Sequence, residues 1–315
     1  MAAKPKDNEL RLTRVFDAPV QAVWDAWNDP QQVAQWWGPR GFTITHISKD
    51  LRPGGHWKYT MHGPDGVDYP NRTVYHEVVP LQKLVYDHGG TEDTPPLFRV
   101  TVLFTERDGK THLDMTMTLA TAWAAKATAD FIKKAGGEST WDRLAEYLAH
   151  TGAHKEQFVI ARSFDTTIDR MFEMWTDPKH FVQWLPPTGM TMQFIRADIR
   201  PGGVGFFSMT DGKSVTMFGR VHYCEIRRPD RLVYMQEFVD EHENVSRHPF
   251  APTWPAAMLT TVQFEEEWPG RTRVSITWEP TGPTTAEEMQ MFIKERAGMT
   301  QGWSGSFEKL EALLA

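Results

Sequence analysis

The stretch FDAPVQAVWDAWNDPQQVAQWWGPRGFTITHISKDLRPGG, residues 16–55, returns 148 positions later as FDTTIDRMFEMWTDPKHFVQWLPPTGMTMQFIRADIRPGG, residues 164–203. The two stretches align without a gap, and Trp27 in the first matches Trp175 in the second. A period of this length exceeds any solenoid repeat and is typical of a whole domain duplicated in tandem. The function of the chain therefore depends on what one such domain does.

The length of 315 residues suits two domains, each large enough to bury its own core. We expect them at residues 1–150 and 154–315, joined through the short, small-residue segment 151–153. The 13 tryptophans and 15 methionines are many for this length and fit either an aromatic-rich core or a lined ligand cavity.

Charge and cysteine usage exclude several classes of protein. The net charge of −7, without any basic run, argues against a nucleic-acid partner. No apolar stretch is long enough to span a bilayer, and none follows the N-terminal lysines as an export signal would require. Cys224 is the single cysteine, which excludes an internal disulfide. We therefore expect a cytoplasmic protein.

Each copy begins with an alternating, strand-like segment, at residues 9–16 and 157–164. The helix that follows carries apolar residues at i, i+3, i+4 and i+7, which places them on one buried stripe. Asp17 and Asp165 precede these helices and are expected to cap them. A second short helix is expected after the Asp-Pro pair in each copy.

An Arg-Pro-Gly-Gly sequence in each copy predicts a tight turn between two strands. Hairpin signals beyond it predict about six antiparallel strands, followed by a long C-terminal helix. Gly136-Gly137 in the first copy and Gly298 and Gly302 in the second are expected to kink this helix or to let it approach another backbone closely. A sheet with its helices segregated in this way is α+β, with the long helix covering the apolar face of the sheet.

The motifs that identify the fold in the first copy are residues 27–30 with 36–37, the turn at 50–55, and the strands at 75–80 and 84–86. With their counterparts in the second copy, they resemble the SRPBCC superfamily of START-like, or helix-grip, proteins. Within it, both halves are similar to the domain named for the activator of the heat-shock protein 90 ATPase.

This resemblance implies two tandem helix-grip domains of the birch-pollen-allergen-like type. Each would be a curved antiparallel sheet of about six or seven strands around a long C-terminal helix, with two short helices after the first strand. The superfamily includes lipid carriers, hormone receptors, cyclases and co-chaperone domains, so the fold alone does not decide the function.

Pocket candidates lie on the strand after the tight turn, whose apolar face should meet the long helix. They are Trp57, Tyr59 and Met61 in the first copy and Phe207 and Met209 in the second. Trp37 is a further pocket candidate, and Trp36 and Trp184 are expected near the mouth of a cavity. The same residues also fit a closed core, and the sequence leaves both alternatives open.

Catalytic motifs are weak in this sequence, which lacks a Gly-x-Ser-x-Gly elbow and a His-Glu-x-x-His zinc motif. Glu77 and Glu225 stand in otherwise apolar strands, and burial in a cavity would make either a general acid or base, with a histidine such as His88 as partner. Alternatively, strand alternation turns them toward solvent, or Arg52 or Arg200 pairs with them.

Metal ligation is also conceivable at two places, and we favour neither. The histidines of the first copy's strands are largely replaced in the second copy, and the acidic loop of the second copy is expected to be solvated. These candidates are His56, His62, His76 and His88 in the first copy and residues 240–243 with His248 in the second. We expect no metal and no cofactor.

The leading hypothesis is binding of a hydrophobic or aromatic small molecule in one or both domains. Alternatives are a cyclase, dehydratase or hydrolase, and an interaction protein like the chaperone activator, although the activator's N-terminal docking domain has no counterpart here. Positions that differ between the copies are the best guides to function: Trp37 against Leu185, Trp57 against Gly205, and the longer loop 239–257 of the second copy.

Overall fold

The computed structural model divides the chain into two compact units, residues 1–153 and 154–315. The described residues are 5–89, 94–134, 136–137, 139–152 and 156–315. Ala153, at the end of the expected junction, lies outside them. No helix within these ranges is long and apolar enough to cross a membrane.

The first unit is a seven-stranded antiparallel sheet in the order β1-β7-β6-β5-β4-β3-β2, with four helices in its described part. Its elements are β1 (Glu9–Phe16), α1 (Val20–Asn28), α2 (Pro30–Trp36), β2 (Thr43–Lys49), β3 (His56–His62), β4 (Asp68–Val79), β5 (Lys83–His88), β6 (Phe98–Arg107), β7 (Lys110–Thr118), α3 (Ala122–Lys134) and α4 (Ser139–Thr151).

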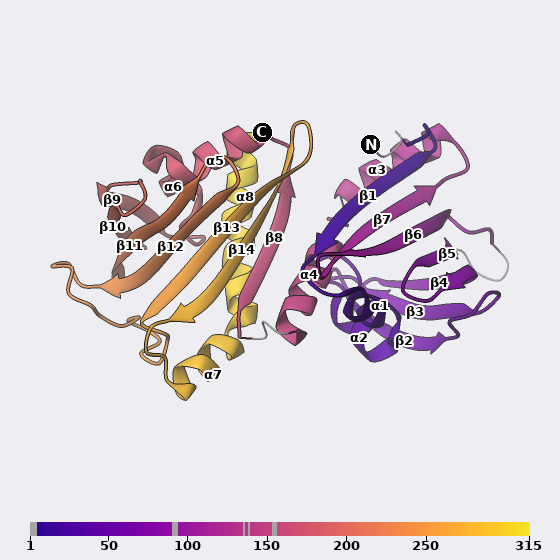
Figure 1. Cartoon of the computed structure of the whole chain (residues 1–315), viewed down its shortest axis with the longest axis horizontal. Helices are drawn as coiled ribbons and strands as arrows, with labels where there is room; N and C mark the ends of the chain where they lie inside the picture. The colour runs from indigo at the N-terminus through magenta and orange to yellow at the C-terminus, as the bar shows by residue number, and fades with distance from the viewer. Residues whose placement is uncertain (1–4, 90–93, 135, 138, 153–155) are drawn as a thin grey trace. The chain divides into compact units, whose positions relative to one another are not determined.

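The second unit repeats this topology, in the order β8-β14-β13-β12-β11-β10-β9. Figure 1 shows its long helix α8, in yellow, lying along the sheet. The predicted α+β helix-grip architecture, with about six or seven strands per copy, is therefore confirmed. Its elements are β8 (Phe158–Phe164), α5 (Ile168–Thr176), α6 (Pro178–Trp184), β9 (Thr191–Ala197), β10 (Val204–Thr210), β11 (Thr216–Arg227), β12 (Arg231–Val239), β13 (Ala257–Trp268), β14 (Arg271–Thr281), α7 (Ala286–Lys294) and α8 (Arg296–Leu314).

The prediction that Asp17 and Asp165 cap the first helix of each copy is wrong. Both lie three residues before the helix begins, one turn too early to reach its free N–H groups. Thr167 caps α5 by accepting from the N–H of Arg170, whereas in α1 the N-cap residue is Pro19 and the N–H of Val20 donates to the carboxylate of Glu106 at 2.8 Å. Asp29, from the Asp-Pro pair, does cap α2.

The Arg-Pro-Gly-Gly turn joins β2 to β3, as predicted, and ties the pair to β4. Gly54 has φ of +80°, and its N–H donates to the carbonyl of Tyr75 at 2.8 Å. A Cβ on Gly55 would lie 2.2 Å from the carbonyl oxygen of Asp50. The first glycine is thus required by conformation and the second by space.

The C-terminal helix differs between the copies. In the first unit it is divided into α3 and α4, and Gly136 between them has φ of +66°. In the second unit α8 runs for 19 residues and buries Trp303, Phe307 and Leu310 against the sheet. The expected interruption is therefore found at Gly136 in the first copy. The expectation of a kink at Gly298 and Gly302 is wrong, because α8 continues through both, and the break in the second copy lies earlier, at Glu295 between α7 and α8.

Candidate functional site

The second unit encloses a cavity of about 730 Å³ between the sheet and α8. Its walls come from strands β10 to β14, from helices α5 to α8 and from the segment 248–256 that follows β12. The volume falls in the range of sites that bind drug-sized molecules. Such a space arises because a curved sheet meets a straight helix over part of its length.

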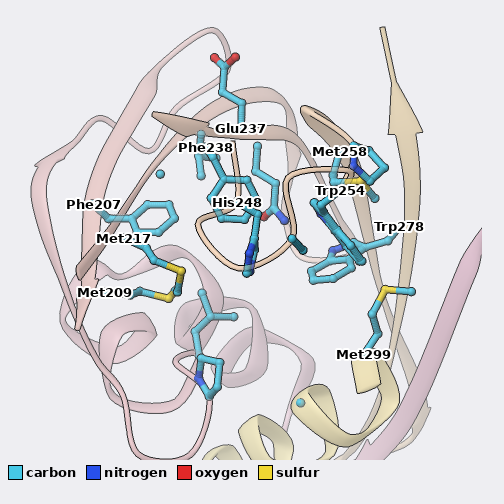
Figure 2. Close-up of a pocket in the computed structure, with 18 of the residues that line it drawn as sticks. Phe207, Met209, Met217, Glu237, Phe238, His248, Trp254, Met258, Trp278 and Met299 are labelled. Carbon is cyan, nitrogen blue, oxygen red and sulfur yellow. The ribbon is translucent and has the colours of Figure 1, made fainter. Parts of the chain in front are cut away.

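Apolar side chains form most of the cavity wall (Figure 2). Phe207, Met209 and Met217 lie on one side, and Trp254 and Trp278 lie on the other. Two further lining residues, Trp175 of α5 and Trp303 of α8, stack with ring centroids 6.1 Å apart. This wall suits a flat, apolar molecule.

The loop between β12 and β13 closes one side of the cavity with His248 and Trp254. Arg247 fixes it in place through an ion pair with Glu288 of α7 and a 3.2 Å hydrogen bond to the carbonyl of Trp254. The ring of Trp254 also packs on Phe292, at 5.8 Å. The sequence marked this loop as a difference between the copies, but its role as a cavity wall was missed, because loop length does not reveal where a loop folds.

His248 projects into the cavity (Figure 2). Its ring packs edge-on against Phe238, with centroids 5.0 Å apart, and its Nδ1 accepts a 3.1 Å hydrogen bond from the N–H of Phe250. Nδ1 must then be unprotonated, so the neutral ring carries its proton on Nε2. Burial lowers the pKa of His248, which favours this neutral form.

Two buried tyrosines, Tyr223 of β11 and Tyr234 of β12, line the same cavity with ring centroids 6.1 Å apart. Burial raises the pKa of both well above its usual range, so both are neutral phenols. A Cβ placed on Gly205 would lie 3.6 Å from the hydroxyl of Tyr223. That hydroxyl therefore lies beside Gly205.

The first unit fills the corresponding space with indole rings. Trp57 stacks on Tyr59 at 4.1 Å and meets Trp37 edge-on at 5.3 Å. The indole N–H of Trp37 donates to the Tyr59 hydroxyl at 2.9 Å. All three are buried, with exposed fractions of 8% or less. At the positions of Trp37 and Trp57 the second unit has the smaller residues Leu185 and Gly205. Leu185 lines the cavity, whereas the ring of Phe194 lies 3.2 Å from a Cβ placed on Gly205.

The predicted pocket residues therefore divide into two groups. Phe207 and Met209 line the cavity of the second unit, while Trp37, Trp57 and Tyr59 belong to the closed core of the first. Met61 is partly buried and packs against that core.

The expectation that Trp36 and Trp184 lie at a cavity mouth is wrong. Both are completely buried, and their indole N–H groups donate at 2.9 Å to the carbonyls of Ala26 and Met174. These bonds join the two short helices of each copy. The tryptophans are therefore structural, and their position in both copies follows from the shared fold.

The acid and base candidates lie away from the cavity. Glu77 pairs with Lys83 at 2.8 Å, and Glu225 with Arg231 at 3.0 Å, so the expected partners Arg52 and Arg200 are not the ones used. Both glutamate side chains are more than 40% exposed, and neither lines the cavity. The alternative that these glutamates face solvent is therefore confirmed, and a register shift lies just before each of them.

His88, the third candidate, belongs to the first unit. Its ring stacks on Phe98 with centroids 5.0 Å apart. Part of the residue is exposed, yet the protein atoms around the ring lower its pKa to about 4. His88 is therefore neutral near pH 7, and its partner in an acid–base pair is absent, since Glu77 bonds Lys83 instead.

The metal candidates have other partners. His62 bonds Asp68 and His76 bonds Asp87, at 2.6 and 2.7 Å, and Glu243 of the acidic loop pairs with Arg196 at 2.7 Å. Among the described residues, a different group brings three potential metal ligands together, spaced i, i+4, i+7 along α5 and α6: Glu173, Asp177 and His180. Here Asp177 caps α6 and Glu173 pairs with Arg170 at 2.8 Å, so the cluster is already satisfied.

A seven-stranded antiparallel sheet that grips a C-terminal helix, with an apolar cavity between them in the second unit, defines a helix-grip protein. The sequence matches the family described as Activator of Hsp90 ATPase homolog 1-like protein over residues 17–149 and 165–315. The chain belongs to this family, with two copies of its domain. No curated protein matches the sequence.

Solved structures similar to this chain include single-domain and full-length examples. Protein Ms6760 from Mycobacterium smegmatis is 31% identical, with 46% of this chain and 94% of that one covered and a TM-score of 0.43. Protein NE0264 from Nitrosomonas europaea is 23% identical, with 47% and 97% covered and a TM-score of 0.43. DynU16, from the dynemicin biosynthetic locus, is 17% identical, with 98% and 100% covered and a TM-score of 0.34.

Proposed function

We propose that the protein binds a hydrophobic or aromatic small molecule in the cavity of its second unit. The observation that carries the proposal is the cavity of about 730 Å³ with its predominantly apolar wall. The first unit, with Trp37 and Trp57 in the equivalent space, serves as a closed structural partner. The function is therefore divided unequally between two copies of one fold.

The physical basis is the transfer of apolar surface out of water. Each Å² of buried apolar surface contributes about 25 cal/mol, so a ligand that buries about 300 Å² gains about 7 kcal/mol before the costs of association. A largely preformed cavity keeps the cost of ordering side chains small. A gain of about 7 kcal/mol corresponds to a Kd of about 10 μM, and the costs of association weaken it, so we expect affinities between about 10 μM and 1 mM for a ligand of this size.

The test is titration of the full chain with Nile red, an uncharged dye whose fluorescence increases in apolar surroundings. The double substitution Leu185→Trp with Gly205→Trp restores to the second unit the indoles that fill the first. Phe194, 3.2 Å from a Cβ at position 205, must shift slightly to admit the new ring. Ile195→Trp adds the same ring at an exposed position of the same unit and is the matched control.

We expect one Nile red to bind the wild-type chain and the Ile195→Trp control, and binding to weaken at least about tenfold in the double variant. Far-UV circular dichroism and thermal melting establish that the double variant is folded. The proposal fails if the wild-type chain does not bind the dye. It also fails if a folded double variant binds it with unchanged affinity.

The two alternative functions gain no support from the geometry. The acid–base enzyme needed Glu77 or Glu225 in a cavity, and both pair with cations outside it. No feature of the described part of the chain favours a chaperone contact, so the co-chaperone alternative is not proposed.

A further inference from the structure

The charges around the cavity restrict the kind of ligand that it accepts. Its described lining residues include no lysine or arginine. Two carboxylates belong to the lining, and neither occupies the interior: Glu295 is exposed where α7 ends, and Glu237 points away from the cavity (Figure 2). The interior therefore offers no positive charge to an anionic ligand.

The nearest cations are already committed to other groups. Arg220 donates to Glu237 at 2.7 to 2.8 Å, and Arg247 pairs with Glu288 while bonding the carbonyl of Trp254. Recruiting either arginine would leave a carboxylate without its partner or release the loop that closes the cavity. A bound anion would thus lose its hydration without gaining a counter-charge.

The cavity lining carries several neutral hydrogen-bond donors, among them the indole N–H groups of Trp175, Trp278 and Trp303, which are buried without a hydrogen-bond partner among the described residues. Two further donors are the side chains of His248 and Tyr223. The Nε2–H of His248 is fixed by the bond that Nδ1 accepts from Phe250, and no described residue bonds Nε2. The hydroxyl of Tyr223, a lining residue, likewise has no hydrogen-bond partner among the described residues. Buried donors of this kind favour a ligand that carries an acceptor.

We propose that the cavity selects an uncharged aromatic ligand bearing a carbonyl-type hydrogen-bond acceptor, held by His248 and Tyr223, and that it rejects aromatic carboxylates. This rests on the proposed function, since it names the ligand class of the same site. The aromatic wall binds the ring system, and the two donors set its orientation. Selectivity against anions follows because no lysine or arginine is among the described lining residues.

The test uses three ligands that share one ring and nearly one shape. They are 2-acetylnaphthalene, which is neutral with an acceptor, 2-isopropylnaphthalene, which is neutral without one, and 2-naphthoate, which is anionic. Each competes with Nile red on the full chain, and isothermal titration calorimetry checks the affinities directly. We expect the ketone to bind about fivefold more tightly than the hydrocarbon and at least about tenfold more tightly than the carboxylate.

The variants assign the selectivity to named groups. His248→Phe and, separately, Tyr223→Phe should each reduce the ketone's advantage over the hydrocarbon. Unchanged binding of 2-isopropylnaphthalene in either variant shows that the cavity is intact. Tyr223→Phe removes a single oxygen atom, so it tests the donor role even if the histidine variant disturbs the loop.

The outcomes separate this inference from the proposed function. Carboxylate binding as tight as that of the ketone, or equal binding of ketone and hydrocarbon, overturns the inference while Nile red binding still supports the function. An advantage of the ketone that survives both variants also overturns it, because the donors would then lie elsewhere. Absence of Nile red binding to the wild-type chain defeats both proposals together.

Discussion

Replacing Trp57 by alanine should destabilise the first unit alone. The ring is only 2% exposed, stacks on Tyr59, meets Trp37 edge-on and lies 4.4 Å from the ammonium of Lys49. Truncating a buried tryptophan costs about 3–5 kcal/mol, which includes the aromatic contacts that are lost. The Trp57 indole N–H has no hydrogen-bond partner among the described residues, so no such bond is lost. We expect about 4 kcal/mol.

The assay must report each unit separately, because the second unit is expected to keep its stability. Urea titration with pulsed hydrogen exchange and mass spectrometry does so, using peptides from β5 and from β12. With a slope of about 2 kcal/mol per molar urea, a loss of about 4 kcal/mol lowers the midpoint of the first unit by about 2 M. The midpoint of the second unit should not move.

Trp123→Ala is the control, since this tryptophan of the same unit is 79% exposed. Its effect should stay within about 0.5 kcal/mol. A midpoint shift below about 0.5 M for Trp57→Ala would refute the reasoning, because it would mean that the indole does not fill the core. An equal shift in both units would refute it too, since the effect would then not be confined to the unit that contains the ring.

Three further predictions use the same domain-resolved unfolding measurement. Because the folded pKa of His88 is about 4, below the ordinary value of 6.5, the unfolded chain takes up its proton first as pH falls. Stability present above pH 6.5 is therefore lost between pH 6.5 and 4, by at most about 3 kcal/mol, and His88→Gln should remove that loss; an unchanged pH profile would contradict this. Asp29→Ala should cost about 1 kcal/mol through loss of the α2 cap, whereas Asp17→Ala should cost under about 0.5 kcal/mol; equal effects would reinstate Asp17 as a cap. Gly55→Ala should cost about 2 kcal/mol or more, because the new Cβ meets a backbone carbonyl at 2.2 Å; a smaller loss would show that the turn relaxes.

Much of the fold could be predicted because its signals are local and are repeated. The apolar stripe that contains Trp27, the Asp-Pro pair at Asp29 and the Arg-Pro-Gly-Gly turn each specify an element from a few neighbouring residues, and each occurs in both copies. The prediction that Asp17 caps α1 was wrong because the start of the helix was inferred from residue type, whereas α1 begins three residues after Asp17.

The candidate site was harder to predict, since it depends on space rather than on pattern. Tyr59 and Phe207 occupy the same strand position, yet one lies in a closed core and the other lines a cavity. The two environments differ because of the volume of neighbouring side chains that are distant in sequence. Strand alternation carries no information about that volume. Glu77 shows the same limit in another way, because its exposed position agrees with strand alternation, whereas its partner is Lys83 on the neighbouring strand and not the expected Arg52.

The comparison of the copies offers a physical account of how one fold provides both a core and a cavity. Where the first unit has Trp57, the second has Gly205, and the Tyr223 hydroxyl beside that glycine is left without a partner among the described residues. Removing side-chain volume from a core leaves a cavity and lowers the free energy of unfolding, unless a bound molecule occupies the cavity. A ligand that bonds this hydroxyl and stacks on the aromatic wall would restore both kinds of contact. Binding should therefore raise the unfolding midpoint of the second unit and leave that of the first unchanged.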